Sequence, residues 1–214
     1  MLFQVARAGM ASGGRTASEA TLKVISYNIQ EGGGGRLSLI ASILRQHEPD
    51  VVARLEADSR AYVKVLNQEL GMQVAFGEAS TSGGHIAWLS RPPIHRTRNH
   101  RNPHLAKTLL ELETTWEGKP LHLFATHLAS RWGAPEPVDE IPIILDTLRR
   151  RADQPHLLVG DFNSLRSGDS AGLPPEGVEK RGDAVDGAPR AAIRLILNLS
   201  VIRRIDLALC WKFR

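Results

Sequence analysis

An acid and an amide stand two residues apart where a short apolar run of the chain ends. The run covers residues 157–159, and Gly160, Asp161 and Asn163 follow it. A short apolar run bounded by turn residues predicts a buried strand, in which residues i and i+2 share one face. Asp161 and Asn163 are therefore expected to project together from the strand end, where ligands often bind. The alternative is an ordinary turn, because Asp and Asn both favour turns.

Three further predicted strands or hairpin arms also end in a polar residue. The β-branched run 22–29 contains Asn28, the run 51–56 ends at Glu56, and the run 121–126 delivers His127. Each has a simple structural explanation, such as a solvated Glu or a structural His. Strand ends can, however, meet at one edge of a sheet, where a rigid scaffold carries a functional site. We therefore expect these side chains to converge with Asp161 and Asn163.

The chemistry of this set favours a hard divalent cation. Carboxylates and amides are ligands for a cation that keeps several waters, so the set predicts Mg²⁺ or Mn²⁺. Zinc would require more His or Cys than the set supplies. A cation, a histidine and a carboxylate around one point suit hydrolysis of a phosphate ester, in which charge stabilisation and water positioning dominate.

Amphipathic helices alternate with the predicted strands and must position their ends. Leu37, Ile40, Ala41 and Leu44 fall at helical spacing, and they predict a helix over 36–46. Further helices are expected over 59–70 and 138–151, with Pro142 tolerated in the first turn of the latter. The remaining predicted strands cover 73–76, 85–90, 109–116 and 201–209, and a turn is expected over 117–120. Residues 165–189, rich in Gly and Pro, predict a long loop.

Composition limits the class of protein. The 214 residues are 42% hydrophobic, enough for one substantial core, and the net charge of +4 suits a phosphate-bearing partner weakly. The single Cys210 excludes an intramolecular disulfide framework, and no apolar run is long enough to span a bilayer. We expect a disordered leader over 1–20, one domain over 21–210 and a truncated tail over 211–214. The chain is predicted to be a cytoplasmic monomer.

Six segments, taken in order, resemble the endonuclease/exonuclease/phosphatase superfamily, the Mg²⁺-dependent group that includes DNase I-like nucleases. Among them, Gly-Asp-Phe-Asn at 160–163 and Thr-His-Leu at 126–128 are the most specific. The other matching segments are 26–30, 49–56, 89–94 and 204–207. The resemblance implies an α/β fold of the α+β type. It is a four-layered α/β/β/α sandwich of two mixed β-sheets flanked by helices, with a site at one edge.

The resemblance also implies roles for individual residues. Asn28 looks like the amide near the metal, and Glu56 resembles the metal-binding glutamate. His127 is similar to the histidine that contacts the scissile phosphate, and Asp161 looks like the acid that handles protons on the attacking water or leaving group. Asn163 is similar to the amide that orients that acid and the phosphate.

The end of the chain departs from the family pattern. Asp206 resembles the aspartate that holds the family's last catalytic histidine, yet no histidine follows His156. The expected function is therefore a Mg²⁺- or Mn²⁺-dependent phosphoester or phosphodiester hydrolase of impaired activity. The alternative is a non-catalytic module that binds phosphate or nucleic acid on the same fold. A third interpretation is an ordinary α/β domain whose polar strand ends are structural.

The substrate is left open between DNA, RNA and a small phosphoester. A basic strip could contact a polyanion, although a solvated surface explains it equally well. The strip consists of His95, Arg96, Arg98, His100 and Arg101, with Arg203 and Arg204 as a second group. His85 is a further candidate to face the pocket, whereas Trp88 and Trp116 are expected in the core.

Overall fold

The computed structural model describes residues 22–57, 59–80, 84–129 and 137–163, together with the backbone of three short strands outside these ranges. The predicted leader, the long loop 165–189 and the tail 211–214 lie outside the described residues, apart from the strand at 3–4. Among the described residues, none of the helices combines the length and apolar character needed to cross a bilayer.

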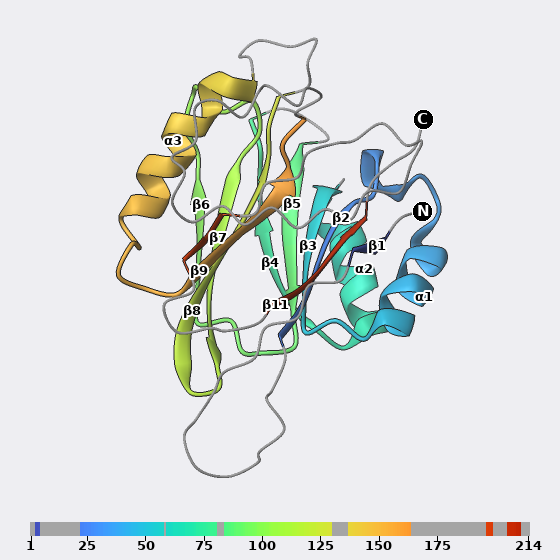
Figure 1. Cartoon of the computed structure of the whole chain (residues 1–214). Helices are drawn as coiled ribbons and strands as arrows, with labels where there is room; N and C mark the ends of the chain where they lie inside the picture. Colours follow the sequence, from blue (N-terminus) through green and yellow to red (C-terminus); the bar gives the residue numbers. More distant parts are fainter. Residues whose placement is uncertain are drawn as a thin grey trace, which may run out of the picture.

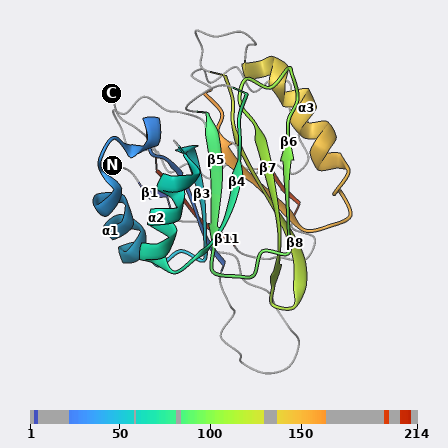
Figure 2. The same cartoon turned by 180° about the vertical axis from the view of Figure 1, so that it is seen from behind.

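Two mixed β-sheets pack face to face, and helices cover their outer faces (Figures 1 and 2). The first sheet has the order β1 (Phe3–Gln4), β11 (Ile205–Cys210), β2 (Leu22–Asn28), β3 (Val51–Ala57), β5 (His85–Ser90), β4 (Gln73–Gly77). The second has the order β10 (Ile196–Asn198), β9 (His156–Asp161), β8 (Lys119–His127), β7 (Leu109–Trp116), β6 (Arg96–His100). The predicted four-layered sandwich is confirmed.

Three apolar clusters correspond to the three contacts between these layers. The first lies between the sheets and contains Trp88, which is fully buried. The second lies between the first sheet and the helices α1 (Leu37–His47) and α2 (Arg60–Leu70). The third packs α3 (Pro137–Arg149) against the second sheet. The core positions predicted for Trp88 and Trp116 are confirmed, because Trp116 packs against the first cluster.

Local chemistry explains both ends of α2. The Ser59 side chain accepts a hydrogen bond of 3.2 Å from the Tyr62 N–H and so caps α2, and Gly71 ends it in the left-handed conformation. Glu48 ends α1 with a φ of 44°. One prediction was wrong: Pro142 is the sixth residue of α3 and so lies beyond the first turn.

The hairpin turn is shorter than predicted. Strand β8 begins at Lys119, so Glu117 and Gly118 alone connect it to β7. Both have positive φ, 47° and 76°, as a two-residue turn between twisted strands requires. The predicted turn residues 119–120 therefore belong to the strand.

Strand direction decides where the polar strand ends lie. Strands β2 and β3 are parallel neighbours, and so are β8 and β9. Parallel neighbours finish at the same edge of their sheet, and β9 also contacts both β2 and β3 across the sandwich. The carboxyl ends of all four strands consequently meet at one edge of the molecule.

Candidate active site at the sandwich edge

Asn28 joins one acid from each sheet. Its Nδ2 donates a hydrogen bond of 2.8 Å to Oε1 of Glu56 and another of 3.0 Å to Oδ2 of Asp161. Its Oδ1 accepts a 2.9 Å hydrogen bond from the Gln30 N–H, which fixes the orientation of the amide. The convergence expected from the sequence is confirmed for Asn28, Glu56 and Asp161.

Glu56 reaches this point through an irregularity in its strand. Pairing between β3 and β5 shifts register between Leu55 and Ala57, and the intervening Glu56 has a φ of 56°. A bulge of this kind redirects a side chain, and positive φ is uncommon for a residue other than glycine. The backbone distortion therefore aims the Glu56 carboxylate at Asn28.

Asp161 is fixed by its neighbours on both sides. Its backbone oxygen accepts a 2.9 Å hydrogen bond from the Leu128 N–H. Gly160 permits the close approach of β9 to β8, since a Cβ at this position would collide with the Thr126 carbonyl oxygen. The Asp161 side chain is 9% exposed, so it is buried while facing the other site residues.

Asn163 does not project beside Asp161 as the strand pattern predicted. Strand β9 ends at Asp161, and Asn163 has a φ of 47°, which breaks the alternation of faces. Its backbone N–H instead donates 3.1 Å to Oδ1 of Asp161, and its Nδ2 donates 2.8 Å to the Leu128 oxygen. The turn explanation was therefore the better one, although the turn helps to orient the Asp161 carboxylate.

His127 completes the group from the end of β8. Its Nε2 lies 3.7 Å from Oδ2 of Asp161 and 4.0 Å from Oε1 of Glu56. Burial and then the neighbouring Lys107 charge lower the pKa of His127 to about 4, against the opposing effect of the two carboxylates. The imidazole is consequently neutral near pH 7.

Lys107 is a site residue that the sequence did not indicate. Its Nζ lies 2.7 Å from Nε2 and 2.9 Å from Nδ1 of His127. Burial lowers the pKa of Lys107, while Glu56, Asp161 and Glu140 oppose this effect. A lysine in a polar stretch just before a strand is normally solvent-exposed, so its type and spacing gave no signal.

Glu140 was also missed, although the helix pattern contained a clue. It lies on the apolar face of α3, four residues before Ile144 and eight before Leu148, and it is only 1% exposed. Its carboxylate accepts hydrogen bonds from the backbone N–H groups of Ala106 and Ala129, each 2.6 Å long. Burial raises the pKa of Glu140, against these two hydrogen bonds. An acid on an apolar helix face is the anomaly that could have identified it.

The other sequence candidates lie elsewhere or have structural partners. The His85 ring packs 5.4 Å from that of Phe76, and its Nδ1 accepts 3.0 Å from the Ala79 N–H. Asp206 lies on β11 with its Cα in register with Lys23, five residues before Asn28 along β2. Its backbone is therefore about 16 Å from the converging strand ends, and its catalytic role remains a prediction.

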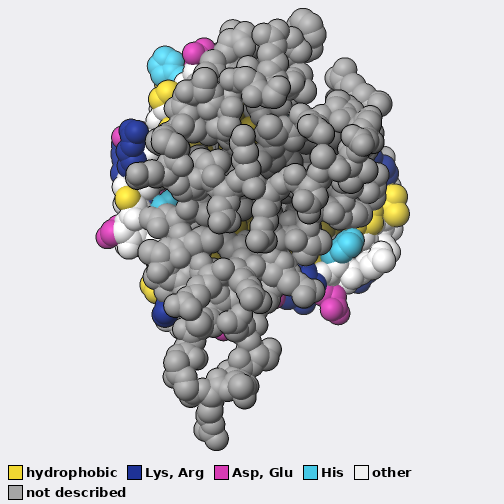
Figure 3. Space-filling view, in the orientation of Figure 1, with side chains coloured by type: hydrophobic (Ala, Val, Ile, Leu, Met, Phe, Trp, Pro, Cys, Tyr) yellow, Lys and Arg dark blue, Asp and Glu magenta, His cyan; other side chains and the backbone are white. Residues whose placement is uncertain are grey.

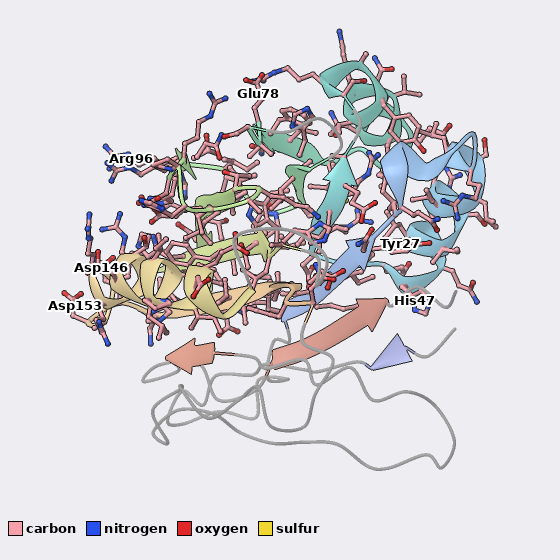
Figure 4. All side chains as sticks on the ribbon, turned by 90° about the horizontal axis from the view of Figure 1, so that it is seen from above. Tyr27, His47, Glu78, Arg96, Asp146 and Asp153 are labelled. Atoms are coloured by element: carbon pink, nitrogen blue, oxygen red, sulfur yellow. The ribbon has the colours of Figure 1, made fainter. Side chains whose placement is uncertain are left out.

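Part of the predicted basic strip is engaged within the protein. His95 contacts Thr115 at 2.7 Å, and Arg101 forms a 2.8 Å ion pair with Glu78. Arg96 extends away from the protein on exposed β6 (Figure 4). Where described side chains are visible in Figure 3, basic and acidic groups both occur along the margins. The second basic group, Arg203 and Arg204, lies outside the described residues.

The converged side chains fit a hard cation held largely by water. Glu56 and Asp161 supply carboxylate oxygens on both sides of Asn28, as Mg²⁺ or Mn²⁺ prefers. Within the described ranges, no three His, Cys, Asp or Glu side chains form a complete metal-binding group. A cation at this edge would therefore depend on water and substrate oxygens for its remaining ligands, which is common for Mg²⁺.

Several solved structures have a similar fold. D. rerio TDP2 humanized by 14 mutations has a TM-score of 0.61 and 26% identity, over 72% of this chain and 68% of that one. D. rerio TDP2 complexed with a single-strand DNA product has a TM-score of 0.61 and 25% identity, over 72% of this chain and 66% of that one. Truncated Caenorhabditis elegans TDP2, at 21% identity and a TM-score of 0.61, covers 81% of this chain and 82% of its own and supports the fold alone.

Comparison of the sequence with curated proteins and with protein families identifies a family and no individual relative. No curated protein matches the chain significantly. The profile of the Endonuclease/Exonuclease/phosphatase family matches residues 25–210, which include all four converging strand ends. The chain belongs to the Endonuclease/Exonuclease/phosphatase family.

Proposed function

We propose that this chain is a divalent-cation-dependent hydrolase of phosphodiesters, with nucleic acid as its first candidate substrate. The observation that carries the proposal is the bridge from Asn28 to Glu56 and Asp161, with His127 within 4.0 Å of both acids. Membership of the family supports phosphoester hydrolysis in general. The cation, the roles of the residues and the substrate are parts of the proposal.

Glu56 is the residue that would hold Mg²⁺ or Mn²⁺ directly, and the adjacent Asn28 would orient its carboxylate through the 2.8 Å hydrogen bond. When bound, such a cation polarises a phosphoryl oxygen and stabilises the charge that develops during displacement. Asn28 also holds the two carboxylates together, because its single amide group donates a hydrogen bond to each. The placement of the two carboxylates therefore depends on Asn28 whether or not a cation is bound.

His127 and Lys107 can stabilise the negative charge of a phosphodiester transition state. A neutral His127 donates an N–H to a phosphate oxygen, and the nearby Lys107 ammonium adds a fixed positive charge. Donors already aimed at developing charge are a principal source of catalysis. Asp161 accepts the proton of the attacking water or supplies one to the leaving group, while the Asn163 N–H holds its carboxylate in place.

Turnover by this 214-residue chain is proposed to be low. No histidine follows His156, so the water activator that the resemblance implies after Asp206 is not among these residues. The loss of a general acid or base commonly lowers the rate about 10²- to 10⁴-fold. Proton transfer would then depend mainly on Asp161.

Single-stranded DNA is the substrate to test first. The D. rerio TDP2 structure that is 25% identical contains a single-strand DNA product. The experiment follows cleavage of a labelled single-stranded oligodeoxynucleotide and of bis-p-nitrophenyl phosphate at high enzyme concentration, with Mg²⁺, Mn²⁺ or EDTA.

Asp161→Asn tests the site, and Asp153→Asn is the matched control. Asp153 is exposed in the turn after α3 and lies at the periphery in Figure 4. We expect cation-dependent turnover that falls at least about 10²-fold in Asp161→Asn and is unchanged in Asp153→Asn. Turnover that persists in EDTA or in Asp161→Asn would contradict the proposal. Cation-independent binding of the oligonucleotide without cleavage would favour the non-catalytic alternative.

A further inference from the structure

We propose that Glu140 is a positioning residue that sets the relative placement of Lys107 and His127. This inference rests on the proposed function, because it assigns Glu140 to the same site. Glu140 contacts neither acid of the Asn28 bridge in the hydrogen bonds described above. It acts instead through the backbone of the two segments that carry Lys107 and follow His127.

One carboxylate ties these two segments together. Oε1 of Glu140 accepts 2.6 Å from the Ala106 N–H, and Oε2 accepts 2.6 Å from the Ala129 N–H. Ala106 directly precedes Lys107, and Ala129 is the second residue after His127. The same carboxylate therefore fixes the backbone on both sides of the 2.7 Å contact between the Lys107 Nζ and the His127 Nε2.

Because Glu140 is buried, its carboxylate depends on these two backbone hydrogen bonds. A buried carboxylate is unfavourable unless hydrogen bonds compensate for the lost water. Charge-assisted hydrogen bonds are shorter and stronger than neutral ones, and both oxygens of Glu140 are used in this way. An apolar residue would pack on α3 without that penalty, but it could not accept from either backbone N–H.

The charge of Glu140 also acts on Lys107. Together with Glu56 and Asp161, it favours the ammonium form of this lysine. A cation held by Glu56 would compete with Lys107 for the nearby carboxylates. Glu140 lies on the α3 side and would continue to attract the ammonium group.

The decisive variant is Glu140→Gln, compared with Asp139→Asn. Glutamine keeps the shape of the side chain and one acceptor, but it presents an NH₂ group to the second backbone N–H. Asp139 is the exposed neighbour on the same helix, so Asp139→Asn removes one acid from the same turn. The readouts are kcat and KM for bis-p-nitrophenyl phosphate, and the NMR signals of the Ala106 and Ala129 amides and the His127 imidazole.

We expect Glu140→Gln to lower kcat about tenfold, equivalent to about 1.4 kcal/mol of barrier, with KM within about twofold. The Ala106, Ala129 and His127 signals should shift in Glu140→Gln and stay in place in Asp139→Asn. In a Lys107→Met background, Glu140→Gln should cost less than about twofold, because coupled residues are not additive. Glu140→Asp, which keeps the charge, should recover part of the loss.

Three results would overturn the inference. They are wild-type kcat in Glu140→Gln, unchanged His127 signals, or a full additional tenfold loss in the Lys107→Met background. If the wild type hydrolyses nothing, the proposed function fails separately. The His127 signals, recorded with and without inorganic phosphate, then decide the positioning role. If Glu140→Gln does not fold, the same measurements on Glu140→Asp decide it, because this side chain is one methylene shorter and its carboxylate cannot keep the same distances to the two backbone N–H groups.

Discussion

Two groups of buried charge are built in opposite ways: one lies on the second sheet, and the other joins the two sheets at their edge. Away from the site, one acid, Glu111, is surrounded by donors. It forms hydrogen bonds with His100 at 2.7 Å and His122 at 3.1 Å, and it accepts 3.0 Å from Arg151. Although burial alone would raise it, these donors hold the pKa of Glu111 well below its usual range.

The candidate site places groups of the same kind side by side. The acids Glu56 and Asp161 share a single amide donor, and the bases Lys107 and His127 lie against each other. The Glu111 group is satisfied by protein atoms, whereas the site has acceptors and donors suited to a cation and a phosphate. The difference supports the proposal that the first group stabilises the fold and the second serves catalysis.

The largest effect is expected from a substitution that alters the site without altering stability. His127→Gln should lower turnover about 10²- to 10³-fold, as for loss of a donor to a developing anion. The unfolding free energy should change by no more than about 1 kcal/mol. Steady-state kinetics and urea denaturation measure both quantities. A large loss of stability with little loss of turnover would reverse the assigned roles.

The complementary change should affect stability alone. Glu111→Gln leaves three donors around a neutral amide, so we expect a loss of about 3 kcal/mol in unfolding free energy. Turnover at 25 °C should remain within about twofold of the wild type, since folding remains favourable. Glu113→Gln, on the same strand, is the control and should cost about 1 kcal/mol or less.

The pH dependence of the unfolding free energy tests whether the charge of Glu111 stabilises the fold. Because the pKa of folded Glu111 lies below its ordinary value of 4.5, its stabilisation is present above that value and is lost as pH falls below it. The difference in unfolding free energy between the wild type and Glu111→Gln should therefore shrink on acidification from about pH 5. Denaturation at a series of pH values measures it, and a constant difference would show that the charge of Glu111 contributes little.

The smallest expected effect concerns the two bases of the site. Lys107→Met removes the neighbouring positive charge, so the pKa of His127 should rise from about 4 but stay below 6.5, because burial remains. NMR titration of the imidazole in EDTA measures the shift. An unchanged pKa of His127 would mean that the Lys107 ammonium group does not contact the His127 ring in solution.

Much of the fold and half of the site follow from local sequence patterns. Asn28, His127 and Asp161 could be predicted because each ends a strongly patterned strand and parallel neighbours end together. The redirection of Glu56 by a bulge and the turn at Asn163 could not, since they depend on contacts between strands. The same holds for Lys107 and Glu140, whose burial results from the packing of α3 and two connecting segments.

The most direct test compares Asp161→Asn with Glu111→Gln for both cation-dependent phosphodiester turnover and unfolding free energy. We expect Asp161→Asn to lose turnover while its stability is kept, and Glu111→Gln to lose stability while its turnover is kept. Parallel losses of both quantities in both variants would contradict this expectation, because the two groups of charge would then have the same role.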